Sequence, residues 1–166
     1  MDAQPARSEL ERALDLAHRA VGRRERTISE LRIVLERKRV GPGAIDAAVA
    51  ELCEEGLLDD ARYARRFTED KRELELWGSE RIARELHRRG IPPDLIEAVV
   101  VADRGREAEL ATALLLLEQR LPIPPRDDRE RDRAWRLLVR RGHTAEIAYE
   151  AVRAHERRSA EGPRAA

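Results

Sequence analysis

Short clusters of basic residues are the feature of this sequence that most resembles a binding site. Three clusters recur at separations of 51 and 52 residues, each at the end of a predicted helix: Arg37-Lys38, Arg88-Arg89 and Arg140-Arg141. A further pair, Arg65-Arg66, lies within another predicted helix. Guanidinium and ammonium groups bind phosphate and carboxylate oxygens, so such clusters suit a phosphate backbone or an acidic protein groove. Cations at a helix C-terminus also stabilise the helix by about 0.3–1 kcal/mol, which is a purely structural explanation of the same placement.

Residues suited to catalysis or metal binding are not grouped in the sequence. The four histidines lie in different predicted elements and form no HxxxH or HExxH pair: His18, His87, His143 and His155. Cys53 is the only cysteine, so the sequence has neither a CxxC pair nor an internal disulfide. Asp59-Asp60 follows a turn and precedes an amphipathic run, so we interpret it as a helix cap rather than a catalytic pair. We therefore expect a protein that is not an enzyme and holds no metal or cofactor.

Composition indicates a folded helical protein without a membrane segment. The 166 residues include 33 basic and 33 acidic side chains, which cancel, and 42% are hydrophobic. That apolar content is too high for a disordered chain. Only five residues are aromatic, so the core must consist mainly of Leu, Ile, Val and Ala. No apolar run reaches 18 residues and no signal segment precedes the first helix, so we expect a cytoplasmic location.

Glycine and proline divide the sequence into helical segments. Ser8 with Glu11, and Thr27 with Glu30, fit the capping box; Ser79 and Thr144 are further candidate N-caps. No segment alternates with the period of a strand, so we predict no sheet. The predicted helices span residues 8–22, 27–39, 44–55, 60–75, 79–89, 93–103, 106–120, 128–141 and 144–157.

These helices form three copies of one unit. When Leu35, Leu86 and Leu138 are aligned, two apolar positions downstream also coincide without a gap: Ile45, Ile96 and Ala148, then Val49, Val100 and Val152. In this register Arg39 stands where the other copies have Gly90 and Gly142. A three-helix unit of this size is marginally stable alone, whereas units in tandem can share interfaces. The third copy carries a longer loop, Leu121-Pro122-Ile123-Pro124-Pro125.

The predicted fold class is therefore all-α, with three tandem three-helix repeats in an elongated rod that can curve. We place repeat 1 at residues 1–56, repeat 2 at 57–105 and repeat 3 at 106–158, followed by a disordered tail at 159–166. Such arrays present long surfaces of repeated positions, which suits an extended partner.

The middle repeat carries a recognisable pattern. Gly56-Leu57-Leu58-Asp59-Asp60-Ala61-Arg62-Tyr63-Ala64-Arg65-Arg66-Phe67 is followed by Gly78-Ser79-Glu80-Arg81-Ile82 and by Arg89-Gly90-Ile91. This pattern resembles the RecX family of bacterial recombination regulators. The match is specific over about residues 56–100, and the outer repeats keep parts of it.

The resemblance implies a non-enzymatic regulator built from three-helix repeats. RecX-like proteins bind the RecA recombinase, lie in the groove of its filament on single-stranded DNA, and restrain strand exchange, ATP hydrolysis and coprotease activity in DNA repair and the SOS response. We expect a monomer that meets RecA through Arg37, Lys38, Arg65, Arg66, Arg88, Arg89, Arg140 and Arg141.

Two other functions stay open from the residues alone. The chain could be a helical-repeat adaptor for another protein, or a weak DNA-binding protein that acts on nucleic acid directly. The zero net charge argues against tight autonomous DNA binding. The predicted helix at 93–103 is apolar and acidic, which argues against sequence-specific base reading.

Overall fold

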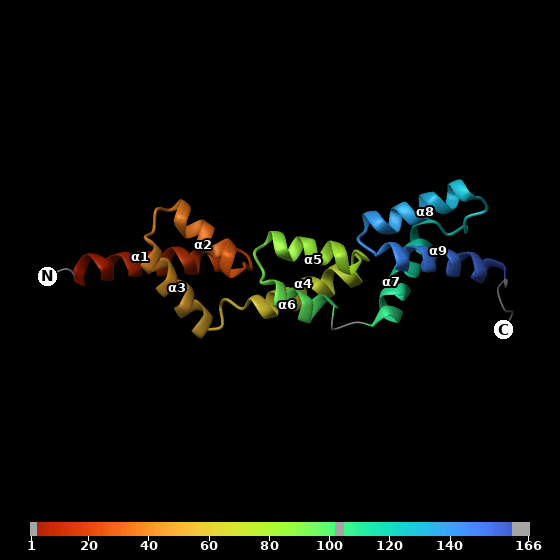
Figure 1. Ribbon diagram of the computed structural model, residues 1–166. Coiled ribbons are helices and arrows are strands. Elements are labelled where there is room, and N and C mark those ends of the chain that lie inside the picture. The colour runs from red at the N-terminus through yellow and green to blue at the C-terminus, as the bar shows by residue number, and fades with distance from the viewer. Residues whose placement is uncertain (1–2, 102–104, 161–166) are drawn as a thin grey trace. The chain divides into compact units, whose positions relative to one another are not determined.

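The computed structural model describes residues 3–101 and 105–160, which form nine α-helices and one π-helical turn and contain no strand (Figure 1). The prediction of an all-α fold is confirmed. The helices are α1 (Ala3–Arg23), α2 (Ile28–Arg37), α3 (Pro42–Glu54), α4 (Asp60–Glu73), α5 (Ser79–Arg88), α6 (Pro93–Ile96), α7 (Arg106–Arg120), α8 (Asp128–Arg140) and α9 (Ala145–Ala160). No helix in these described ranges is long and apolar enough to cross a membrane.

The chain divides into two compact units. Unit 1 comprises Met1–Ala64 and Leu86–Leu95, and unit 2 comprises Arg65–Glu85 and Ile96–Ala166. Both α4 and α5 therefore contribute residues to each unit. The three repeats with boundaries near 56 and 105, and their arrangement as a rod, stay predictions. Of the predicted tail, residues 161–166 lie outside the described part of the chain.

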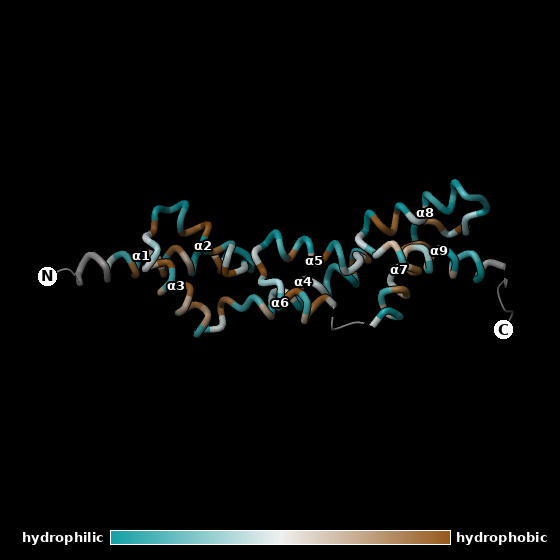
Figure 2. The backbone as a smooth tube through the Cα atoms, in the orientation of Figure 1, coloured by the Kyte–Doolittle hydropathy of each residue, from teal (hydrophilic) through white to brown (hydrophobic). Residues whose placement is uncertain are grey.

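The core of unit 1 lies where α1 and α3 cross. Ala13 and Ala17 of α1 are fully buried and, one turn apart, share one face of the helix. Their small side chains allow α3 to approach closely, and Leu52 of α3 is also fully buried. Leu31 and Leu35 of α2 complete this core. Figure 2 shows the hydrophobic residues concentrated where these helices meet.

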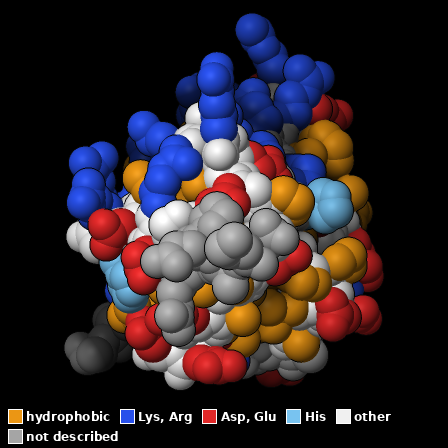
Figure 3. Space-filling model, turned by 90° about the vertical axis from the view of Figure 1, so that its left-hand side faces the viewer, with side chains coloured by type: hydrophobic (Ala, Val, Ile, Leu, Met, Phe, Trp, Pro, Cys, Tyr) orange, Lys and Arg blue, Asp and Glu red, His pale blue; other side chains and the backbone are white. Residues whose placement is uncertain are grey.

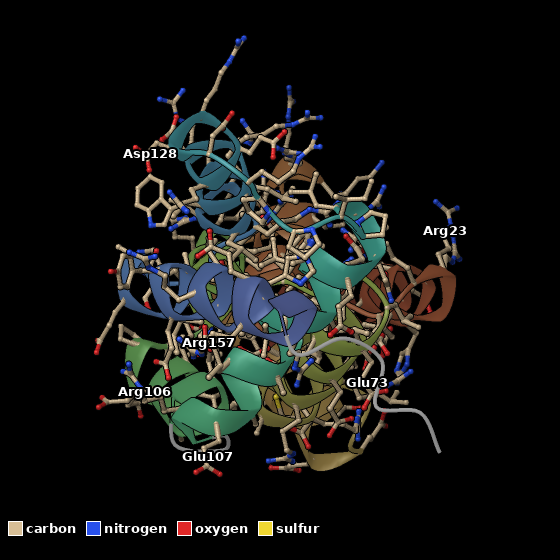
Figure 4. The ribbon with its side chains drawn as sticks, turned by 90° about the vertical axis from the view of Figure 1, so that its right-hand side faces the viewer. Arg23, Glu73, Arg106, Glu107, Asp128 and Arg157 are labelled. Atoms are coloured by element: carbon tan, nitrogen blue, oxygen red, sulfur yellow. The ribbon has the colours of Figure 1, made fainter. Side chains whose placement is uncertain are left out.

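The core of unit 2 is centred on α7 and α9. Leu116 and Leu117 of α7 pack in one buried cluster with Ala148 and Ala151 of α9. The start of α7 is also tied to α9 by charge, because Arg106 forms ion pairs of 2.8 Å with Glu146 and 2.6 Å with Glu150. Figure 4 shows Arg106 beside α9 at this end of the helix.

Polar caps begin several helices. The Thr27 hydroxyl accepts from the Glu30 amide at 3.1 Å, and the Thr144 hydroxyl accepts from the Ile147 amide at 3.2 Å, so both predicted caps are confirmed. The other two are wrong. Ser8 lies inside α1, which begins at Ala3, and Ser79 is already the first residue of α5.

The predicted helix at 93–103 changes its geometry along its length. After one α-helical turn the chain continues as a π-helical segment from Glu97 to Val101, and residues 102–103 of the prediction lie outside the described part of the chain. The buried Arg72 guanidinium donates to the Val100 carbonyl at 2.6 Å. Val100 lies near the end of this segment, where carbonyls have no amide of their own helix to accept from, so Arg72 supplies the missing donor. The sequence gives no signal of this contact, because Arg72 lies 28 residues upstream.

The second helix of each repeat ends in the same turn. In α2, α5 and α8 a residue with positive φ follows the helix, and the next amide donates back to an aligned leucine carbonyl. These bonds run from Val40 to Leu35 at 3.2 Å, from Ile91 to Leu86 at 3.1 Å and from His143 to Leu138 at 3.1 Å. This is the Schellman motif. Its positive-φ residues, with φ of 57°, 78° and 88°, are Arg39, Gly90 and Gly142, as the register predicts.

Replacing Arg39 with glycine should stabilise the protein. Arg39 is the one member of this set with a Cβ, which disfavours positive φ. We expect Arg39→Gly to raise the free energy of unfolding by about 1 kcal/mol and the melting temperature by about 2–4 °C. Thermal denaturation followed by circular dichroism measures this. Arg37→Gly, at the last residue of α2 and without a positive φ, is the matched control and should destabilise by up to about 1 kcal/mol. An equal loss in both variants would contradict the explanation.

Candidate partner-binding surface

The three basic clusters occupy equivalent positions in the helix-end turns. The first residue of each pair is the last residue of its helix, and its side chain is exposed: Arg37, Arg88 and Arg140. The second residue is the C-cap, and here the repeats differ. Lys38 is exposed, whereas Arg89 and Arg141 are half-buried. The structure therefore separates the predicted contact residues into exposed cations and half-buried cations.

Arg89 belongs to a polar network inside unit 1. Its Nη1 donates to the Tyr63 hydroxyl at 2.7 Å and to Glu30 Oε1 at 3.2 Å. Arg24 also pairs with Glu30, at 2.9 Å. Tyr63 is 8% exposed, and burial raises the pKa of its hydroxyl, so the phenol stays protonated and accepts from Arg89. The Arg89 guanidinium is thus directed at its own fold.

The backbone of the same turn is joined to the start of α2. The Thr27 hydroxyl donates to the Arg89 carbonyl at 2.7 Å while it caps α2. Gly90 lies so close that an added Cβ would stand 2.3 Å from the Ser29 Cβ. The Thr27 side chain at the start of α2 therefore satisfies a free carbonyl at the end of α5.

We call this meeting of the end of one second helix with the start of another a joint. Unit 2 contains an equivalent joint between the end of α8 and the start of α5. The Gly78 amide donates to the Arg141 carbonyl at 2.9 Å, and the Glu80 amide donates to the Gly142 carbonyl at 3.1 Å. The Arg141 side chain donates to the Glu75 carbonyl at 2.9 Å. A Cβ on Gly142 would stand 2.5 Å from the Arg81 amide nitrogen. Arg141, like Arg89, thus holds a joint between second helices.

A buried histidine lies behind this second joint. His143 is fully buried, and its Nε2 is 3.2 Å from the Leu76 carbonyl, so Nε2 carries the proton. Its Nδ1 has no hydrogen-bond partner and lies 4.0 Å from Glu109 Oε1. That carboxylate accepts from the Ser79 amide at 3.0 Å and the Ser79 hydroxyl at 2.8 Å. Burial lowers the pKa of His143, so the ring stays neutral.

Arg65 and Arg66 are exposed on α4, in unit 2.

Trp77, between α4 and α5, packs against two cations. The Arg81 guanidinium is 3.9 Å and Lys71 Nζ 4.9 Å from its ring centroid. Such stacking keeps the Arg81 guanidinium on the ring. Figure 3 looks at unit 1 from its N-terminal end, where basic and acidic side chains are both exposed.

The described residues offer no metal site and no activated nucleophile. They contain no group of three or more His, Cys, Asp or Glu side chains that could hold a metal ion. Asp59 accepts from the Arg62 amide at 2.8 Å, and Asp60 accepts from the Ile28 amide at 2.9 Å, so this pair serves the backbone, as expected. Burial raises the pKa of the Cys53 thiol, which disfavours the reactive thiolate.

Comparison with known proteins identifies the family. A model described as RecX, second three-helix domain, matches residues 59–100. The regulatory protein RecX of Halorhodospira halophila is 37% identical over 153 residues, which cover 90% of this chain and 91% of that protein. The chain belongs to the RecX family. The regulatory protein RecX of Trichlorobacter lovleyi is 35% identical over 75% of this chain and 82% of its own. RecX-family proteins are regulatory and not enzymes.

Solved RecX structures share the fold. The crystal structure of RecX from Lactobacillus salivarius superposes with a TM-score of 0.79 at 15% identity, over 90% of this chain and 97% of that chain. A second RecX crystal structure has a TM-score of 0.77 at 19% identity, over 92% of this chain and 76% of its own. The region matched to the second three-helix domain includes Arg65, Arg66, Arg88 and Arg89, whereas the other candidate residues lie outside it.

Removing Arg89 should destabilise the fold, although its charge looks like part of a binding surface. Arg89→Ala leaves Glu30 and Tyr63 without their shared partner. We expect the free energy of unfolding to fall by about 1–2 kcal/mol. Lys38→Ala is the matched control, because Lys38 holds the same cap position with an exposed side chain, and it should change stability by less than about 0.5 kcal/mol. Urea denaturation measures both, and equal effects would refute a structural role for Arg89.

Stability should fall below neutral pH because of His143. Its folded pKa is lowered, so below the unfolded value of about 6.5 the unfolded chain binds more protons than the folded one. The stability from this residue is therefore present above about pH 6.5 and lost as the pH falls toward the folded pKa. His143→Ile, which copies the equivalent Ile91 of the second repeat, should reduce the difference in unfolding free energy between about pH 7.5 and 5.5. An unchanged difference would assign the pH dependence to other groups.

Proposed function

We propose that this chain binds RecA and its filament on single-stranded DNA and restrains strand exchange, ATP hydrolysis and coprotease activity in DNA repair and the SOS response. The observation that carries the proposal is membership of the RecX family along nine-tenths of the chain, because this family modulates RecA. We further propose that it acts as a monomer in the cytoplasm.

The accessible cations are the proposed contacts. Arg37, Arg88 and Arg140 end the second helices of the three predicted repeats with exposed side chains, and Lys38, Arg65 and Arg66 are exposed as well. Arg89 and Arg141 belong to the proposed site in a different way. Their guanidinium groups hold the turns that present their exposed neighbours, so we assign them a positioning role.

Several weak contacts would act together. A single exposed ion pair contributes about 0–1 kcal/mol, which is too little for specific binding. Contacts joined in one chain become intramolecular after the first has formed, so their combined affinity far exceeds each alone. The zero net charge means that attraction comes from local clusters, and salt should weaken it strongly. A regulator that contacts neighbouring subunits of a filament in this way would hinder the motions needed for turnover.

The test is DNA-dependent ATP hydrolysis by the cognate RecA, titrated with this protein at low and high salt. We expect inhibition that weakens with salt. The triple variant Arg37→Glu, Arg88→Glu, Arg140→Glu should raise the half-inhibitory concentration at least about tenfold, because three contacts become repulsive. Co-sedimentation with RecA filaments should fall in parallel.

A control variant carries the same charge change elsewhere. Arg129→Glu, Arg157→Glu and Arg158→Glu reverse three exposed arginines outside the helix-end clusters. This control should inhibit as the unmodified protein does, and circular dichroism should show equal helicity in both variants. Equal loss in both triples would mean that total charge, not the helix-end position, decides binding. Absence of inhibition and of co-sedimentation by the unmodified protein would leave a helical adaptor with another partner.

A further inference from the structure

The loop between α7 and α8 forms a hollow that the helix-end clusters do not use. The loop runs from Leu121 to Asp127 and lies within unit 2. It includes Leu121 to Pro125, the longer loop of the third predicted repeat. The hollow has a volume of about 270 Å³. Its apolar wall consists of Leu121, Pro122, Ile123 and Pro125. Ile123 is 72% exposed beside these other apolar residues, so the wall of the hollow is accessible to a ligand.

The loop is held in shape before any partner arrives. His155 Nε2 lies 2.9 Å from the Leu121 carbonyl and fixes the start of the loop to α9. At the other end Glu130 accepts from the Arg126 amide at 2.8 Å and from its guanidinium at 3.4 Å. The prolines restrict the backbone between these anchors. A preformed hollow needs little ordering on binding, which favours affinity.

The rim of the hollow is positively charged. Arg120, Arg126 and Arg133 line it, against the single carboxylate of Glu130. Glu130 is already engaged by Arg126, and this contact lowers the pKa of its carboxyl group, so it stays charged. Arg120 and Arg133 are exposed. An apolar wall beneath cationic guanidinium groups fits a ligand that combines an aliphatic side chain with carboxylates.

The chemistry of the wall favours a peptide over a nucleic acid. Single-stranded nucleic acids bind by stacking bases on aromatic side chains, and none of the residues lining this hollow is aromatic. Leucine, isoleucine and proline instead pack well against an aliphatic side chain of a partner.

We propose that this hollow, named the α7–α8 pocket, binds an acidic peptide segment of a partner protein with one large aliphatic side chain. The aliphatic side chain packs on Leu121, Ile123 and Pro125, while flanking carboxylates pair with Arg120 and Arg133. The proposal does not rest on the helix-end clusters or on the proposed function.

The test uses the full chain and a fluorescein-labelled peptide of sequence Asp-Glu-Leu-Glu-Asp, with binding measured by fluorescence anisotropy. We expect saturable binding. The affinity should fall at least about tenfold in the double variant Arg120→Glu, Arg133→Glu. It should fall about as much in Ile123→Ser, and also when alanine replaces the leucine of the peptide. Amide chemical shifts should move at Ile123 and the neighbouring loop residues. Because all three residues are exposed, these variants should keep the fold.

Matched controls separate this pocket from general charge. Arg129→Glu, Arg157→Glu carries the same charge change outside the pocket, and Figure 4 shows Arg157 on α9, apart from the start of α8 at Asp128. This control should bind the peptide unchanged, as should the helix-end triple variant. Three results would overturn the proposal. The control variant could lose as much affinity as the pocket variant, or replacing the leucine of the peptide could leave the affinity unchanged. The amide chemical shifts could also change only outside the loop. Tighter binding of labelled oligothymidylate at the same residues would also overturn it and assign the pocket to nucleic acid.

Discussion

The end-to-end joint between second helices is the interaction on which the rest of the structure depends. A helix leaves free carbonyls at its end and free amides at its start. Here the turn that ends one second helix meets the start of another. In unit 1 the Thr27 hydroxyl donates to the Arg89 carbonyl, and in unit 2 the Gly78 amide donates to the Arg141 carbonyl. The two sides of each joint lie about 60 residues apart in the chain, so no single helix could supply both.

The joint also explains why two neighbouring arginines differ in what their side chains contact. Arg88 and Arg89 are neighbours in sequence, yet a helix turns about 100° per residue, so they point in different directions. One guanidinium reaches Tyr63 and Glu30, and the other lies at the surface. The half-buried member of each pair fixes the turn through its contacts. The turn then fixes the position of the exposed member. In the proposed function, adjacent residues of the same type thus serve folding and binding.

The sequence predicts the register well because the repeat and the turn are local. The aligned leucines and the position of Arg39 opposite Gly90 and Gly142 follow from spacing alone, and the Schellman bonds confirm them. Contacts between distant segments leave no such pattern. Arg72 donates to the Val100 carbonyl 28 residues further along the chain, and the sequence near either residue does not predict this contact. The same holds for the α7–α8 pocket, whose inserted loop is visible in the sequence but whose charged rim depends on how α7 and α8 pack.

The turn at Arg39, which lacks the glycine of the other two, has a consequence for the length of the array. Docking of a neighbouring helix start needs glycine at this position, since Ser29 and Arg81 come within 2.3 Å of where a Cβ would stand on Gly90 and Gly142. Arg39 carries that Cβ, so a unit duplicated ahead of repeat 1 would find its docking site obstructed. The end of α2 is therefore closed to the joint that the ends of α5 and α8 make, and a designed array could be extended in that direction only after Arg39 is replaced by glycine.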